Sequence, residues 1–296
     1  GDDTHQFTGS LFISGSRIGF TNPSRNIFFG DETGDLVTGA DNTFLGYRAG
    51  YSADTDGSNT GLQNVIIGSK AVGNNQGQYA EAFDMTGTVA IGYQVLKNGA
   101  GSSNSVVIGS QAADAVTSTD NLVIIGSGAG SAINSGDADG TVAIGYQAGY
   151  AITSGQGNVA IGYGALDAED DGDFNTAIGY AALSAQTGTA GEMGSTAMGY
   201  KAGTSLTTGK GNTLLGYDAG RYQTTQTYNT VVGWQSSKRN YKGEHRVTIG
   251  AEAGHYSTGS YNTFIGSAAG QGGTTSAPFS SGGGNVAVGY QALTAF

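Results

Sequence analysis

The sequence Asn158-Val159-Ala160-Ile161-Gly162-Tyr163 is followed, 17 residues later, by its variant Asn175-Thr176-Ala177-Ile178-Gly179-Tyr180. Both copies place a β-branched residue and a large apolar residue two positions apart, and Gly comes directly after them. Stiff β-branched side chains with this spacing favour a strand, and Gly favours a turn. Neither copy has the length or the spacing of a helix. The motif therefore predicts a short β-strand that ends at a turn.

The motif occurs fifteen times, and its Gly, here called the anchor Gly, is the reference point for each copy. The anchors are Gly30, Gly46, Gly68, Gly92, Gly109, Gly126, Gly145, Gly162, Gly179, Gly199, Gly216, Gly233, Gly250, Gly266 and Gly289. Their commonest spacing is 17 residues and the widest is 24. Repeats of this length predict a solenoid, because one unit cannot bury its apolar side alone and stacked units can. We therefore expect an all-β fold, a parallel β-roll or β-solenoid of about fifteen coils over residues 26–296, with residues 1–25 as an N-terminal cap or connector.

The three residues before each anchor, at positions −3, −2 and −1, make both faces of the predicted strand apolar. Position −3 is β-branched and position −1 is large and apolar in all fifteen copies, while position −2 is apolar in every copy except the one with Thr248. A strand that is apolar on both faces must be covered on both. One face can line its own coil, so the other needs a neighbouring chain, and a homotrimer is the simplest closed bundle. We expect residues such as Ile161, and the mixed Val and Thr column at position −3, to be buried.

Two further positions predict how the coils stack. Position +3, three residues after the anchor, is Ala in twelve copies, which suits a place where the coil narrows and only a methyl group fits. Position −4 is Asn in nine copies, and stacked Asn side chains can form a hydrogen-bonded ladder.

Composition excludes several classes of function. Lys and Arg number 12 against 23 Asp and Glu, and a net charge of −11 repels a polyanion, so we expect no nucleic-acid partner. Cysteine is absent, which removes disulfides and thiolate chemistry. No apolar run approaches the ~18 residues that cross a bilayer, so we expect no membrane insertion. Neither a phosphate-binding loop nor a nucleophile elbow occurs, and we predict no enzyme activity and no cofactor.

The densest acidic stretch, residues 167–173, holds the candidate metal ligands Asp167, Glu169, Asp171 and Asp173. Alternating carboxylates followed by Gly172 are similar to a calcium loop, but the twelfth position from Asp167 is Ile178 rather than the bidentate Glu. The alternative is a solvated loop whose charge keeps stacked strands from aggregating. The sequence favours that alternative and no metal.

One stretch is cationic, because four of the twelve basic residues lie within residues 238–246. Candidates for contact with a receptor or glycan are Trp234, Lys238, Arg239, Tyr241 and Lys242. Aromatic faces can stack on sugars, and cations attract acidic polysaccharide; an ordinary solvated loop is the alternative. His245 and His255 lie five residues before and after Gly250, so we expect both in solvated turns rather than in a metal site.

Two of the copies resemble repeats of known families. Asn104-Ser105-Val106-Val107-Ile108-Gly109-Ser110-Gln111-Ala112 closely resembles the head repeats of trimeric autotransporter adhesins. Asn212-Thr213-Leu214-Leu215-Gly216-Tyr217 is similar to the related repeats of bacteriophage tail-fibre proteins. The resemblance covers residues 26–296 and implies a left-handed parallel β-roll wound as a homotrimer. In those families such a roll is a stiff shaft or head that reaches from a virion or cell surface to a receptor.

The sequence thus leads to three hypotheses for function. The first is a structural and adhesive fibre segment, extracellular on a virion or cell surface, whose longest insertions (51–63, 73–87 and 271–284) bind a host or cell-surface receptor such as a polysaccharide. The second is a single-chain solenoid that binds a repetitive ligand. The third is a tailspike that cleaves glycan, which needs two carboxyl groups about 5 to 9.5 Å apart in an ordered cleft.

Overall fold

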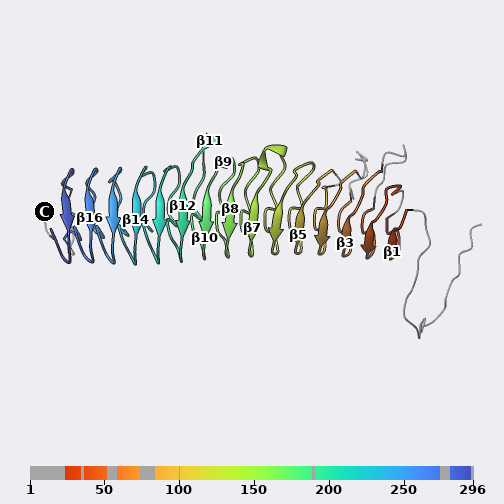
Figure 1. Ribbon diagram of the computed structural model, residues 1–296, viewed down its shortest axis with the longest axis horizontal. Helices are drawn as coiled ribbons and strands as arrows, with labels where there is room; N and C mark the ends of the chain where they lie inside the picture. The colour runs from red at the N-terminus through yellow and green to blue at the C-terminus, as the bar shows by residue number, and fades with distance from the viewer. Residues whose placement is uncertain are drawn as a thin grey trace, which may run out of the picture.

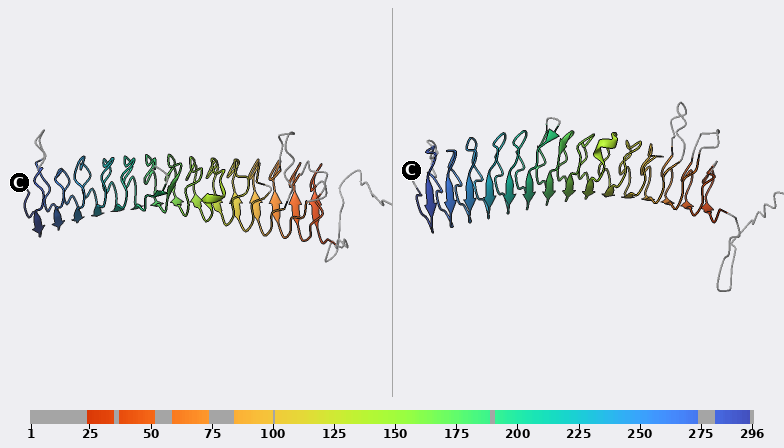
Figure 2. Two further views of the ribbon diagram at one scale, coloured as in Figure 1. Left: turned by 90° about the horizontal axis from the view of Figure 1, so that it is seen from above. Right: turned by 45° about the horizontal axis from the view of Figure 1, so that its top comes forward.

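The computed structural model describes residues 24–34, 37–51, 59–73, 84–99, 101–188, 191–273 and 281–294. Fifteen strands pair in parallel, in chain order, to form one 15-stranded sheet that runs along the molecule (Figure 1). They are β1 (Ile27–Phe29), β2 (Thr43–Leu45), β3 (Val65–Ile67), β4 (Val89–Ile91), β5 (Val106–Ile108), β6 (Val123–Ile125), β7 (Val142–Ile144), β8 (Val159–Ile161), β10 (Thr176–Ile178), β12 (Thr196–Met198), β13 (Thr213–Leu215), β14 (Thr230–Val232), β15 (Val247–Ile249), β16 (Thr263–Ile265) and β17 (Val286–Val288). One strand per repeat in a single row confirms the predicted all-β parallel β-solenoid (Figure 2).

The register between neighbouring strands aligns equivalent repeat positions in straight columns. Thr176 pairs with Val159 on one side and with Thr196 on the other, and each of these three residues is at position −3 of its copy. Every column therefore runs the length of the sheet. Of the expected N-terminal cap at residues 1–25, only Ser24 and Arg25 lie within the described residues, so that expectation remains a prediction.

The anchor Gly is required by backbone geometry. Its φ lies between 120° and 148° in all fifteen copies, a region that L-residues rarely adopt. In addition, a Cβ atom added to any anchor from Gly30 to Gly266 would lie 2.1–2.6 Å from the carbonyl oxygen of the next anchor. The chain also has positive φ, between 44° and 77°, at positions −5, +2 and +4 of every copy. Four positive-φ residues per coil wind the chain back to the start of the next strand.

The interior of the solenoid is lined by positions −2 and +3. Every residue at position −2 from Phe44 to Ala287 is buried, and eleven of the twelve Ala residues at position +3 are buried as well. This confirms the prediction that Ala marks a narrow place in the coil. Position +7 also faces inward, with Val116, Ile133 and Ile152 fully buried.

The expectation that Ile161 faces inward is wrong. Ala160, at position −2, is fully buried, whereas Ile161 and the other residues at positions −3 and −1 are half-buried or exposed on the outside of the coil. The buried assignment of the Val and Thr column at position −3 is therefore also wrong. Both faces are apolar by composition, and the alternation of side chains along the strand places position −2 inside and its two neighbours outside.

The predicted Asn ladder forms inside the coil, mainly between side chain and backbone. Asn158 Oδ1 accepts the N–H of Asn175 in the next coil at 2.9 Å, and Asn158 Nδ2 donates to the carbonyl of Gly172 at 2.8 Å. The same two contacts recur at Asn42, Asn64, Asn212, Asn229 and Asn262. Each Asn thus ties one coil to the next and closes its own loop. These are satisfied buried groups, which a dry interior requires.

Within the described residues, the longer repeat after Gly126 forms a short 3₁₀ helix (Gly136–Ala138) between its strands (Figure 1). The longer repeat after Gly179 contributes β11 (Gly191–Glu192), which pairs in parallel with β9 (Gly172–Asp173) of the preceding coil. Residues 52–58, 74–83 and 274–280 of the expected receptor loops lie outside the described residues.

Candidate functional site

The largest candidate surface is the outer sheet face, defined as positions −3 and −1 of all fifteen strands. None of its thirty side chains carries a charge. In its position −1 column, large hydrophobic residues are exposed toward the two ends of the sheet, and the seven Ile residues from Ile67 to Ile178 are half-buried. The exposed residues are Phe29, Leu45, Met198, Leu215, Ile249, Ile265 and Val288. With strands about 4.8 Å apart and three residues of about 3.3 Å each, this face measures about 70 by 10 Å. Apolar patches of several hundred Å² on a protein surface mark interaction sites.

A ladder of Tyr rings flanks the outer sheet face at position +1. The Tyr ladder consists of Tyr146, Tyr163, Tyr180, Tyr200 and Tyr217, whose successive ring centroids are 5.0–5.3 Å apart in stacked pairs. The five residues are 39–53 % exposed. Stacked rings present an apolar, ordered edge beside the sheet, and their hydroxyl groups can reach water.

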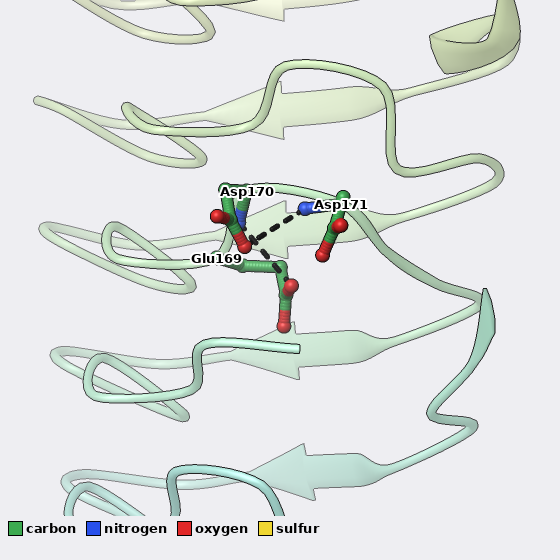
Figure 3. Close-up of side chains that lie close together, drawn as sticks. All are labelled: Glu169, Asp170 and Asp171. Atoms are coloured by element: carbon green, nitrogen blue, oxygen red, sulfur yellow. Dashed lines mark hydrogen bonds between the residues drawn. The ribbon is translucent and has the colours of Figure 1, made fainter. Parts of the chain in front are cut away.

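The acidic stretch forms a compact cluster in the loop after β8 (Figure 3). Carboxylate oxygens of Glu169, Asp170 and Asp171 lie within 4.8 Å of one another. Glu169 occupies the inward position +7 and is fully buried, and burial raises the pKa of its carboxyl group. Its Oε1 accepts the backbone N–H groups of Asp170, Gly172 and Gly188 at 2.8–3.2 Å. Glu169 thus holds the loop together, and we assign no metal to the cluster.

The other two candidate ligands lie apart from that cluster. Asp173, in β9, accepts the backbone N–H of Gln156 at 2.8 Å. It lines a hollow of about 260 Å³ together with Asp171. Burial raises the pKa of Asp167, which lies before the cluster. The structure therefore brings only Glu169 and Asp171 of the four predicted ligands into one group.

The predicted cationic stretch is divided among different contacts. Lys238 Nζ lies 2.7 Å from the buried carboxylate of Asp218, which Arg221 also contacts, so its charge is largely neutralised. Arg239 lies over the ring of Tyr256, and the ring of Tyr241 is tilted on Tyr222. The remaining two candidates are exposed: Trp234 at position +1, beside the outer sheet face, and Lys242 in the loop. Arg239 and Lys242 are the exposed cations of this stretch.

One coil has a polar interior that the sequence analysis missed. Arg246 stands in the Asn column, between Asn229 and Asn262, and is 1 % exposed. Its Nη1 donates to the carbonyl of Ser257 at 2.9 Å, and burial lowers its pKa to about 10. The inward residues around it are polar as well: Thr248 and Ser257 in the same coil, and Ser236, Ser237 and Asn240 in the preceding coil. This coil separates the long apolar core, which ends at Val231, from a smaller one around Phe264.

His255 belongs to the same coil, and the prediction that it is solvated is wrong. It is 5 % exposed, and burial, with Lys238 and Arg239 nearby, lowers its pKa to about 4, while Asp218 acts in the opposite direction. His245 is exposed as expected and stacks between Tyr228 and Tyr261. Residues 17 or 20 positions apart become neighbours in a solenoid, so the burial of a turn residue depends on the coils beside it.

The buried His255 predicts a loss of stability in acid. Between about pH 6.5 and pH 4 the unfolded chain binds a proton at His255 and the folded chain does not, so the free energy of unfolding falls as the pH falls through this range. The full effect is about 3 kcal/mol. We expect His255→Gln to lose this part of the pH dependence in urea unfolding measured from pH 7 to 4. The matched His245→Gln should keep it, and equal pH profiles for the wild type and His255→Gln would contradict the assignment.

These features define the chain as an all-β repeat protein, a parallel β-solenoid with an uncharged outer face. Comparisons with protein-family models, with curated proteins and with solved structures found no match. Among the described residues, no helix has the length and hydrophobicity needed to cross a membrane.

Proposed function

We propose that this chain is a segment of a structural and adhesive fibre, of the tail-fibre or surface-adhesin type, and that it acts outside the cell on a virion or cell surface. Its work is to provide length and stiffness and to present its loops to a receptor on another surface. It acts by binding, without catalysis. The proposal includes a left-handed winding and an assembly of three chains, both of which the resemblance to adhesin and tail-fibre repeats implies.

The observation that carries the proposal is the uncharged outer sheet face. Its area is about 700 Å² per chain, close to the roughly 800 Å² that each partner contributes to a standard protein interface. Apolar residues on it are exposed near both ends, as at Phe29 and Val288, and half-buried from Ile67 to Ile178. A second and third copy of the same chain offer a face with the same length and the same repeat. Closed three-fold symmetry would cover the face on every copy and leave the loops outside.

The tailspike alternative has less support. Glu169 is fully buried, and its Oε1 is occupied by three backbone N–H groups, so it is poorly placed to exchange protons with a substrate. Within the described residues, Asp167 and Asp171 lie in loops and Asp173 lies in the two-residue strand β9, where Asp171 and Asp173 line a surface hollow of about 260 Å³.

The solution mass tests the assembly. We expect light scattering to give about three times the chain mass of 29.7 kDa. The double variant Leu215→Lys/Ile249→Lys should fall to the mass of one chain with an unchanged circular dichroism spectrum, because both side chains are exposed in the single chain. The control Thr117→Lys/Ser118→Lys, in an exposed loop, should keep the wild-type mass.

A wild-type chain with the mass of one copy would contradict the proposal. It would favour the single-chain solenoid, because the mixed Val and Thr column at position −3 would then be free for a flat, repetitive ligand.

A further inference from the structure

We propose that a hollow at the end of the Tyr ladder binds one saccharide ring, a neutral hexose or N-acetylhexosamine. This inference rests on the adhesive part of the proposed function and gives it a site and a ligand class. The hollow, here called the Ser127 notch, encloses about 240 Å³ and spans three successive coils.

The floor of the notch is formed by the small residues of a single coil. Ser127, Gly128 and Ser131 stand at positions +1, +2 and +5 after Gly126. The next coil has Tyr146, Gln147 and Tyr150 at the same three positions, and the preceding coil has Gln111 and Asp114 at positions +2 and +5. The notch therefore exists because Gly128 and Ser131 replace the larger side chains that both neighbouring coils carry at positions +2 and +5. Its walls are two coils apart, about 10 Å between backbones.

The aromatic wall presents an unused ring face. Tyr146 is the first ring of the Tyr ladder and stacks on Tyr163 at 5.1 Å. On its other side the ladder position is taken by Ser127, and no described ring stacks there. Tyr146 and Tyr150 are 47 % and 46 % exposed. A pyranose ring has apolar C–H faces that pack on aromatic faces, so it could continue the ladder at about the same spacing.

The polar wall offers hydrogen-bonding groups that the protein leaves unused. The side chains of Gln111, Ser127 and Gln147 make no hydrogen bond within the described structure. An amide donates and accepts in one plane, which suits adjacent hydroxyl groups on a sugar ring. Asp114 adds an acceptor, and burial raises the pKa of its carboxyl group. Two amides and two Ser hydroxyls are neutral partners, and they favour a neutral polyol over a cation held by aromatic rings.

The notch can be filled at a small backbone cost. Gly128 has φ of 65°, and Gln111 and Gln147 have φ of 56° and 52° at the same position, so Gln is compatible with this conformation. A Cβ atom at Gly128 would approach Gln147 Cγ at 3.5 Å and Tyr150 Cδ2 at 3.9 Å, which are ordinary contacts. Gly128→Gln therefore blocks the notch with the side chain that its neighbours already carry.

Saturation-transfer NMR with the full chain tests the inference. The probes are glucose, galactose and N-acetylglucosamine, with choline as the probe for a cation site. We expect transfer to the ring C–H groups of at least one sugar, with a dissociation constant of about 1 mM. Gly128→Gln and Tyr150→Ala should each weaken binding at least tenfold. The matched control Gly164→Gln, at the same position two coils away, should bind as the wild type does.

The outcomes separate this inference from the fibre proposal. Absence of transfer to all three sugars, transfer to choline alone, or equal binding by wild type and Gly128→Gln would overturn the saccharide site. Light scattering on the same samples reports assembly independently. A three-chain mass without sugar binding would contradict only the saccharide site. A one-chain mass with sugar binding would contradict only the fibre proposal.

Discussion

Ala160→Asp is expected to unfold the coil around β8, whereas Ile161→Asp, one residue later, should leave the single chain folded and abolish its assembly. Ala160 is fully buried and pairs in register with Ala143 and Ala177, so a carboxylate there would be desolvated without a partner. The expected cost is about 4 kcal/mol of unfolding free energy. Ile161 lies on the outer sheet face, half-buried, and a charge there still reaches water in the single chain.

Urea unfolding and light scattering, measured on both variants, check this prediction. Ala160→Asp should shift the urea midpoint strongly, and Ile161→Asp should shift it little while lowering the mass to one chain. Ala160→Ser serves as the control for the change of size without charge. If Ile161→Asp lost its β circular dichroism signal and Ala160→Asp kept it, the assignment of the two faces would have to be reversed.

The strands and their register could be predicted from the sequence because all fifteen copies have the anchor Gly and a β-branched residue at position −3. The inward face could not be predicted from polarity, since both faces are apolar, but a signal was present in side-chain size. In five copies a large residue at position −2 coincides with Gly at position +4, as in Phe44 with Gly50, where an added Cβ would lie 2.5 Å from the Phe ring. In four copies Ala at position −2 coincides with Leu at position +4, as in Ala160 with Leu166, whereas Ala143 and Ala197 coincide with Gly. Such compensation within one coil is expected only between side chains that share the same interior.

The candidate sites were harder to predict, because their partners come from other coils. Lys238 is next to other cations in the sequence, yet its partner Asp218 lies 20 residues earlier. His255 is buried by the coils beside it, and its own segment gives no sign of this. The Ser127 notch is visible only when the copies are aligned at their anchors, where Gly128 stands between Gln111 and Gln147 and the Tyr column from Tyr146 to Tyr217 stops at Ser127. In a solenoid, therefore, columns carry more information about a site than neighbouring residues do.

Gly162→Ala is expected to destabilise the solenoid by about 3 kcal/mol, whereas Gly164→Ala, two residues later, should cost about 1 kcal/mol. Gly162 has φ of 133°, and an added Cβ would lie 2.5 Å from the carbonyl oxygen of Gly179. The backbone cannot move away, because Gly162 N–H donates to Ile144 and Gly179 N–H to Ile161, both at 2.7 Å. Gly164 has φ of 56°, and Ala181 occupies the equivalent position in the next copy. Thermal and urea unfolding of both variants compare these costs, and equal destabilisation would show that the stacked carbonyl does not select Gly.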